Sequence, residues 1–195
     1  RQMEEDLSVV DDARFTITES KEDVDKAVAA AYFAKVYAHK EEWAKVAQYA
    51  QIVLNASDFN YTSMAEVQGA KWDISNTSWL WGYDITQQTT SSFGSFYSHI
   101  DNTITQGYAG GSGAYKNMYS NLYAKIADTD VRKKIYINST LFPTIADRYN
   151  LPDYANVKYA TDQQFLSDYC FIRMEDPFFL YVEALVEQND LTTAK

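Results

Sequence analysis

Between residues 20 and 56, small and apolar side chains recur every three or four positions, and a polar stretch interrupts them at 39–42. This spacing places the recurring side chains on one face of an α-helix. The pattern therefore predicts a helical hairpin over 20–56, with one helix at 20–38 and another at 43–55. The recurring residues are Val24, Ala27, Val28, Ala31 and Ala34 before the polar stretch, and Val46, Tyr49, Ala50, Val53 and Leu54 after it.

The side chains that flank the polar stretch predict how the two helices pack. Ala34 and Tyr37 precede it, and Trp43 and Val46 follow it, an arrangement typical of tetratricopeptide repeats. Small residues let two helices approach, while aromatic residues from each helix fill the groove between them. We therefore expect Tyr37 and Trp43 to be buried. A single repeat cannot bury its own faces, so a second hairpin is expected to pack against the first.

Residues 173–195 are the candidate for that second hairpin. Apolar residues recur at helical spacing, and a polar turn at 188–190 leads into a further helix that the sequence does not complete. Helices pair by burying apolar stripes against one another. We therefore expect 173–195 to be the start of a hairpin, and the chain to be a fragment of a longer protein. The apolar residues of this pattern are Phe179, Val182, Val186 and Leu191.

Residues 57–172 have a mixed pattern that predicts a loop-rich insertion. Trp79 and Trp81 alternate with other residues, which indicates a short strand. Apolar residues at intervals of four predict a short helix over 118–127, and 134–137 is similar to a strand. The expected fold class is mainly α, with tetratricopeptide-like helical hairpins, long irregular loops and a few short strands.

The segment 93–119 is rich in Tyr, Ser, Asn and Gly and is expected to form a long surface loop, which in compact domains is usually functional or mobile. An aromatic ring can stack on the apolar C–H face of a sugar, while Asn and Asp side chains bind its hydroxyl groups. A simpler interpretation stays open, in which these residues pin the loop to the protein. The candidate ligand residues are the platforms Trp81, Tyr97, Tyr108, Tyr115 and Tyr119 and the hydrogen-bonding residues Asp101, Asn102 and Asn117.

Charge and composition exclude several classes of partner. A net charge of −10 over 195 residues argues against nucleic acid and against an anionic membrane surface, because both require a basic face. Cys170 is the only cysteine, so no intrachain disulfide can form. No apolar run is long enough to span a bilayer as a helix. Aromatic residues make up 15% of the chain, which suits both core packing and amphipathic binding surfaces.

We find no catalytic or metal-binding constellation in the sequence. His39 and His99 lack a second ligand at helical spacing, and a zinc site needs three or four ligands. The Gly-rich stretch 110–114 ends in Ala, where a nucleophile elbow requires Gly, and it lacks the Lys of a P-loop. Arg132 is expected to pair with a carboxylate and to fix its loop. Paired carboxylates for glycoside hydrolysis stay open, because an acidic protein has many candidate pairs.

Four segments, in this order along the chain, resemble the SusD/RagB family, the surface lipoproteins that capture nutrients for outer-membrane transporters of Bacteroidetes. The segment 34–53 matches the family's helical repeat, and 76–81 lies where members carry Asn-Ser-Glu-Ile-Ile-Trp. The segment 128–132 resembles an Asp-x-Arg element, and 173–184 resembles the signature Arg-x-x-acid-x-x-apolar-x-x-small-Glu-Ala. The resemblance covers nearly the whole chain but less than half of a typical member. The departures are Val46 for Ala, Ser78 for Glu, Trp79 for Ile, Asp176 for Glu and Val182 for Ala.

The resemblance implies one SusD-like region over 1–195 that acts without catalysis and needs no cofactor or metal. Its implied function is capture of a glycan or oligosaccharide at the surface of the outer membrane and delivery to a TonB-dependent, SusC-like transporter. A lipid anchor outside these residues would hold the full-length protein to the membrane. Two alternatives stay open: a helical-repeat scaffold that binds a protein or peptide, and a fragment of a glycoside hydrolase.

Overall fold

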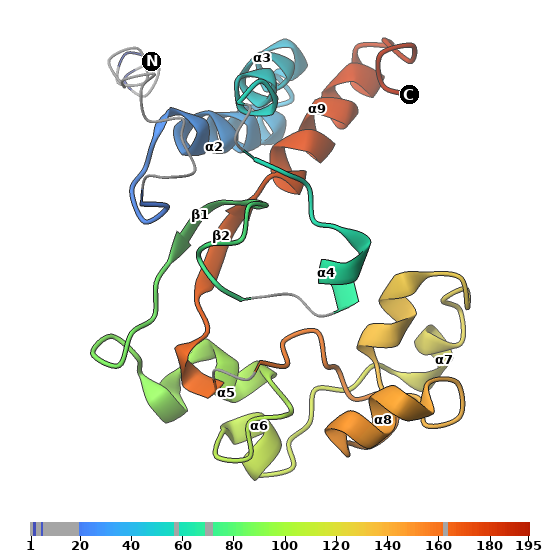
Figure 1. The fold of residues 1–195 in the computed structure, drawn as a ribbon. Helices are drawn as coiled ribbons and strands as arrows, with labels where there is room; N and C mark the ends of the chain where they lie inside the picture. Colours follow the sequence, from blue (N-terminus) through green and yellow to red (C-terminus); the bar gives the residue numbers. More distant parts are fainter. Residues whose placement is uncertain (1, 3–4, 6–19, 57–58, 69–71, 162–163) are drawn as a thin grey trace. The chain divides into compact units, whose positions relative to one another are not determined.

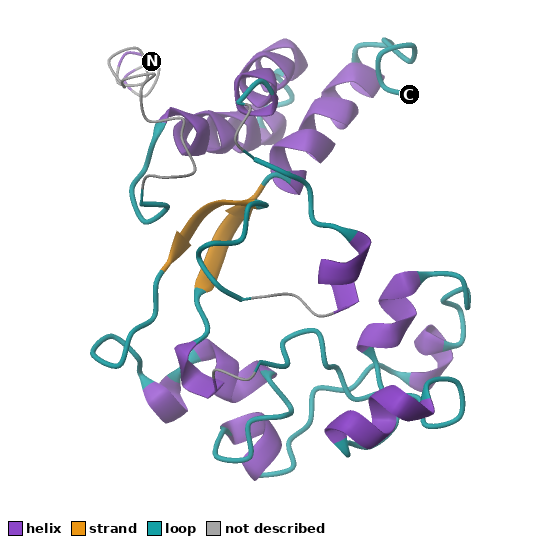
Figure 2. Cartoon of the chain, in the orientation of Figure 1, coloured by secondary structure: helices purple, strands orange, loops and turns teal. Residues whose placement is uncertain are grey.

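The computed structural model describes residues 2, 5, 20–56, 59–68, 72–161 and 164–195. These residues form mostly helices together with a two-stranded sheet, which confirms the predicted fold class (Figures 1 and 2). None of the described helices is both long and apolar enough to cross a membrane. The chain divides into two compact units: the hairpin unit comprises Arg1–Thr62, Ile74–Tyr83 and Tyr169–Lys195, and the loop unit comprises Ser63–Asp73 and Asp84–Asp168.

The hairpin predicted from the periodicity is present as α2 (Lys26–His39) and α3 (Trp43–Leu54). The first helix begins later than the periodicity predicts, because Asp25 caps it. The Oδ1 atom of Asp25 accepts a hydrogen bond from the Val28 N–H at 2.8 Å, which satisfies a backbone donor that has no partner inside the helix. Val24 precedes this cap and is exposed, although the periodicity placed it on the buried face.

The two helices approach through small residues, and aromatic rings fill the groove between them. The ring centroid of Tyr49 lies 4.9 Å from that of Phe33 and 5.5 Å from that of Tyr37, and all three rings are buried. Trp43 is only partly buried against this core, since it is the first residue of α3. The fully buried alanine and valine residues of the two helices are Ala27, Val28, Ala30, Ala31, Ala34, Val46, Ala50 and Val53.

The predicted C-terminal helix is present as α9 (Glu175–Glu187), which packs against α3 and α2 (Figure 1). Its buried face differs from the predicted one: Ala184 and Leu185 are buried, whereas Phe179 is 65% exposed. The small side chain of Ala184 lets the helices approach closely. Among the described residues that follow α9, the chain forms turns and no second helix. The other residues of the predicted stripe are exposed at Val186 and Leu191 and partly buried at Val182.

The strand expected around the two tryptophans is β1 (Trp79–Tyr83), which pairs antiparallel with β2 (Tyr169–Arg173). The register of the pair shifts within β1, so its side chains do not alternate strictly, and Trp79 and Leu80 are both buried. Irregularities of this kind change which face a side chain points to. Gly82 is needed for close pairing, because a Cβ there would lie 2.7 Å from a backbone oxygen of β2.

The loop unit consists of short helices joined by turns (Figure 2). The helix predicted over 118–127 is present but shorter, as α7 (Ser120–Tyr123). The strand predicted at 134–137 is confirmed only as an isolated antiparallel bridge between Tyr136 and Asn156. The preceding Val131–Ile135 forms the 3₁₀ helix η3, which Asp130 caps through its side chain. The other elements of this unit are α4 (Met64–Gln68), η2 (Ser92–Gly94), α5 (Phe96–Ile100), α6 (Tyr108–Gly111), α8 (Pro143–Tyr149) and η4 (Gln164–Leu166).

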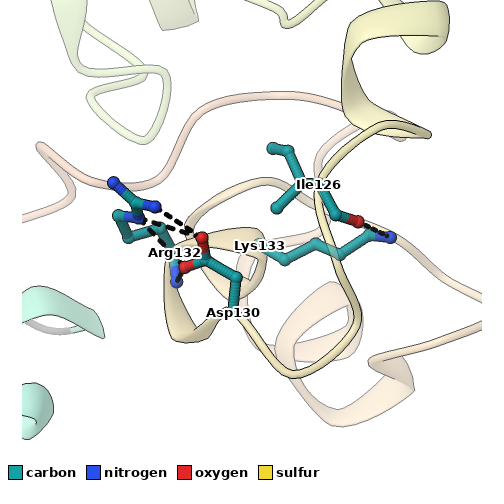
Figure 3. A network of polar contacts seen from close by, with 4 residues as sticks. All are labelled: Ile126, Asp130, Arg132 and Lys133. Carbon is teal, nitrogen blue, oxygen red and sulfur yellow. Dashed lines mark hydrogen bonds and ion pairs between the residues drawn. The ribbon is translucent and has the colours of Figure 1, made fainter.

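Polar contacts fasten the chain between α7 and η3 (Figure 3). The Nε and Nη2 atoms of Arg132 donate to the two oxygens of Asp130 at 3.0 and 2.6 Å, which confirms the expected Arg–carboxylate pair. These hydrogen bonds lower the pKa of Asp130 to about 2. The Nζ atom of buried Lys133 donates to the Ile126 carbonyl oxygen and to the Asp128 carboxylate, both at 2.7 Å. Because these polar groups form hydrogen bonds with one another, the segment has a structural role.

Candidate functional site

The segment 93–119 is more ordered than the long loop that its composition predicts, because it contains the two short helices α5 and α6. Two serine side chains stabilise this arrangement: one caps α5, and the other links α5 to α6. The Ser95 Oγ accepts a hydrogen bond from the Ser98 N–H at 3.1 Å and caps α5. The Ser98 Oγ in turn accepts one from the Tyr108 N–H at 2.9 Å. This bond ties the first residue of α6 to α5, and the two helices pack together (Figure 1).

The glycines of this segment allow α6 to pack closely against the turn that precedes it. A Cβ at Gly110 would lie 2.5 Å from the carbonyl oxygen of Ile104 and 2.7 Å from that of Asn102. Real side chains do not approach backbone atoms so closely, so only glycine fits. The glycine cluster therefore serves helix packing, whereas its composition is typical of a long loop.

Tyr97, a predicted stacking platform, is buried in the loop unit. Its hydroxyl donates a hydrogen bond to the Asp168 carbonyl oxygen at 2.6 Å. Its ring contacts Phe96 at 5.3 Å and Trp72 at 6.2 Å between centroids. The expectation that Tyr97 is exposed is therefore wrong, because the ring packs in the interior and its polar end is satisfied there.

Asn102 is also buried, and it joins three distant parts of the loop unit. Its Nδ2 donates to the carbonyl oxygens of Lys116 and Asn156 at 3.1 and 2.9 Å. Its Oδ1 accepts a hydrogen bond from the Lys116 N–H at 2.8 Å. The Asn102 side-chain amide, predicted to bind a ligand, therefore forms its hydrogen bonds with the protein's own backbone. These bonds fix the position of Lys116.

Asp101 follows α5, and its carboxylate turns inward. The Oδ1 atom accepts hydrogen bonds from the Thr103 N–H at 2.8 Å and from the Thr103 hydroxyl at 2.6 Å. Burial raises the pKa of Asp101 to about 6, although these hydrogen bonds oppose the rise. Asp101 therefore shapes the turn between α5 and α6, and the expectation that it faces a ligand on the surface is wrong.

The raised pKa of Asp101 predicts a pH dependence of stability. The pKa is about 6 in the folded protein against an ordinary 3.8, so the folded state binds more protons between these values, and stability is lost as the pH rises through this window. Asp101→Asn keeps the Oδ1 acceptor but never ionises. We expect its melting temperature (Tm) to exceed that of the wild type at about pH 7.5 and to be close to it at about pH 4. The same difference at both pH values would contradict a buried, titrating Asp101.

Three exposed rings, which we call the aromatic cluster, gather where η2, α5 and α6 each contribute one residue: Phe93, His99 and Tyr108. The ring centroid of Tyr108 lies 5.1 Å from that of His99 and 6.1 Å from that of Phe93. The Phe93 and His99 centroids are 6.5 Å apart. Phe93 is 55% exposed and Tyr108 is 43% exposed. Rings this close offer a ligand a continuous apolar surface with polar groups at its edges.

Lys116 adds a positive charge to the aromatic cluster. Its Nζ lies 6.0 Å from the ring centroid of Tyr108, within the range of a cation–π contact. The side chain is exposed, while both polar groups of the Lys116 backbone bond to Asn102. The charge is therefore presented from a fixed backbone beside an exposed ring.

The remaining predicted residues of this segment lie on the chain after α6. Tyr119 is 69% exposed, and its hydroxyl accepts a hydrogen bond from Asn121 at 3.3 Å. Tyr115 is partly buried and Asn117 is exposed. Among the described residues, the ring contacts of the aromatic cluster include neither Tyr115 nor Tyr119. Of the four predicted tyrosines, the structure thus brings only Tyr108 into this cluster.

Trp81, the remaining candidate stacking platform, belongs to the hairpin unit. It is partly buried, and its Nε1 donates to the Glu22 carbonyl oxygen at 3.0 Å. Its ring centroid lies 4.8 Å from that of Phe171 and 5.9 Å from that of Tyr32. Phe171 and Tyr32 are exposed, so Trp81 serves mainly to support a second group of rings.

Sequence reasoning missed Phe93 and His99. The sequence suggests only a metal-ligand role for His99, and Phe93 is far from Tyr108 in the chain. The signal that could have identified these two residues is the concentration of aromatic residues in 92–99, which contains Phe96 and Tyr97 in addition to Phe93 and His99. Nowhere in the described part of the chain do three His, Cys, Asp or Glu side chains gather as they would around a metal ion. The cluster offers stacking and hydrogen bonding.

The chain is similar in structure to a SusD-like carbohydrate-binding protein of Bacteroides vulgatus, with a TM-score of 0.69 and 18% identity over 98% of this chain and 41% of that chain. A SusD superfamily protein of Bacteroides thetaiotaomicron has a TM-score of 0.67 and 17% identity, over 98% of this chain and 42% of that chain. A SusD superfamily protein of Parabacteroides distasonis has a TM-score of 0.61 and 12% identity, over 90% of this chain and 42% of that chain.

No protein-family model and no curated protein matches the chain. At the identities found, the likeness to the solved structures concerns the fold alone. The chain spans about two fifths of the length of these structures. Its helical hairpin with α9 packed against it is the packing that the helical-repeat pattern predicted. The chain therefore has the SusD-like fold, and it corresponds to about two fifths of the length of these SusD superfamily proteins.

Proposed function

We propose that this chain is part of a SusD-like protein that binds a glycan without catalysis at the surface of the outer membrane and passes it to a TonB-dependent transporter. The observation that carries the proposal is the aromatic cluster, in which three exposed rings lie within 6.5 Å of one another. The fold supports it, since one of the similar structures is that of a carbohydrate-binding protein.

The cluster suits the two kinds of surface that a sugar presents. A pyranose ring has apolar C–H faces and a rim of hydroxyl groups. The rings of Phe93 and Tyr108 can stack on the C–H faces. The Tyr108 hydroxyl and the His99 imidazole can form hydrogen bonds with the hydroxyl groups of the sugar. The cluster is also held in place before binding, by the Ser98–Tyr108 hydrogen bond and by the packing at Gly110. Such preorganisation reduces the ordering cost of binding.

Tyr108→Ala is expected to weaken glycan binding about fivefold, because one stacked ring contributes about 1 kcal/mol beyond area burial. Tyr108 is exposed, so the Tm should change little. The measurement is isothermal titration with a glycan first identified by affinity gel electrophoresis against a panel.

Tyr119→Ala is the matched control, because Tyr119 is a more exposed tyrosine outside the cluster. It should bind like the wild type. Unchanged binding by the Tyr108 variant, or an equal loss in both variants, would contradict the cluster as the site. Release of reducing sugar from the bound glycan would instead favour a glycoside hydrolase.

One observation favours a second candidate, a scaffold for a protein partner. The helix α9 (Glu175–Glu187) packs on α3 with one face and exposes Phe179 and Val186 elsewhere, and Leu191 in the turns after the helix is exposed as well. Helical repeats bind neighbouring helices through such faces, so the partner would be an amphipathic helix. Phe179→Ser separates the two candidates: it should abolish partner binding and leave glycan binding unchanged.

A further inference from the structure

Acidic residues are scarce in the stretch of sequence that forms the aromatic cluster. The whole chain carries a net charge of −10, yet Asp101 is the only acidic residue between positions 85 and 127. Asp101 is buried and bonded to Thr103, so it presents no carboxylate to solvent. The same stretch contains Lys116 and Lys125, both exposed. The cluster thus lies in a segment without exposed acids, on a chain that is otherwise rich in them.

Lys116 is the basic group that the structure places at the cluster. Its Nζ lies 6.0 Å from the Tyr108 ring, and Asn102 holds its backbone. Among the described residues, Lys116 forms no ion pair with a carboxylate. An ammonium group that lies beside an exposed ring and carries no internal counter-charge can pair with an anionic group on a molecule stacked on that ring.

We infer that the aromatic cluster takes a glycan with an anionic substituent, a uronic acid carboxylate or a sulfate, and that Lys116 provides the counter-charge. This inference rests on the proposed function and narrows its substrate class. A chain of net charge −10 repels an anionic glycan at long range. A local cation, in a stretch of sequence (85–127) that exposes no acid, therefore matters more for such a ligand than for a neutral one.

The expected preference is modest, because an exposed ion pair in water contributes little and is screened by salt. The wild type should bind an anionic oligosaccharide about twofold to fivefold more tightly than a neutral one with the same backbone. The preference should shrink as sodium chloride is raised. The Phe93 and Tyr108 rings should contribute equally to both ligands, since stacking does not depend on the charge.

The test titrates matched pairs of oligosaccharides into the protein: galacturonan oligomers with free and with methyl-esterified carboxyl groups, and carrageenan oligomers with their sulfate groups and after desulfation. Lys116→Gln should abolish the preference for the anionic member. Lys125→Gln removes one positive charge from another exposed position, and this variant should keep the preference for the anionic member.

The outcomes separate this inference from the proposed function. Equal binding of both members of each pair by the wild type would overturn the anionic preference and leave glycan binding intact. A preference that survives in Lys116→Gln would overturn the role of Lys116. No binding to any glycan of either kind would overturn both the inference and the proposed function.

Discussion

Trp79→Ala is expected to lower the free energy of unfolding of the hairpin unit by about 3–5 kcal/mol. Trp79 is 0% exposed and has the largest volume of the fully buried side chains in the described residues. Truncating it removes the burial of a large apolar surface and leaves a cavity that the surroundings fill only in part. Urea denaturation followed by far-UV circular dichroism measures the loss, since this signal does not depend on the removed indole.

Trp43→Ala is the matched control in the same unit. Trp43 is partly buried at the first residue of α3, so its truncation should cost less than about 2 kcal/mol. Equal losses from both variants would contradict the burial difference between β1 and the start of α3. A loss below about 1 kcal/mol for Trp79→Ala would mean that β1 is not part of the core.

Asn102→Ala is expected to lower the free energy of unfolding of the loop unit by about 3 kcal/mol. The variant loses three hydrogen bonds to the backbone of Lys116 and Asn156. Each buried polar group left without a partner costs about 1–3 kcal/mol, and relaxation of the chain recovers part of the sum. Urea denaturation again measures the effect.

Asn117→Ala, in the same segment, is the control, because Asn117 is exposed. It should change stability by less than about 0.5 kcal/mol. The pair also distinguishes a scaffold residue from a ligand residue. If Asn102→Ala unfolds like the wild type but loses glycan binding, Asn102 contacts the ligand and the scaffold role assigned to it is wrong.

The fold could be predicted to the extent that local spacing determines it. Periodicity identified α2, α3 and α9, because the apolar face of a helix is encoded within the helix itself. It misplaced the start of α2, where the Asp25 side chain and not the periodicity begins the helix. It also chose the wrong face of α9: Phe179 is as apolar as Leu185, and only packing against α3 decides which of the two is buried.

The candidate site was harder to predict, because residue type does not reveal whether a polar group is already occupied. Tyr97, Asp101 and Asn102 are suitable sugar ligands by chemistry, but their polar atoms bind the protein's own backbone or Thr103. Phe93 and His99 approach Tyr108 only through the folding of η2, α5 and α6. Such long-range proximity leaves no periodic signal in the sequence.

The most direct test of the central claim, that the aromatic cluster binds a glycan, is a crystal structure of the protein with an oligosaccharide selected from a binding panel. We predict a sugar ring in van der Waals contact, about 4 Å, with the ring of Phe93 or Tyr108, and any anionic substituent directed toward Lys116. A sugar bound elsewhere on the protein, with the rings of Phe93, His99 and Tyr108 left uncovered, would contradict the claim.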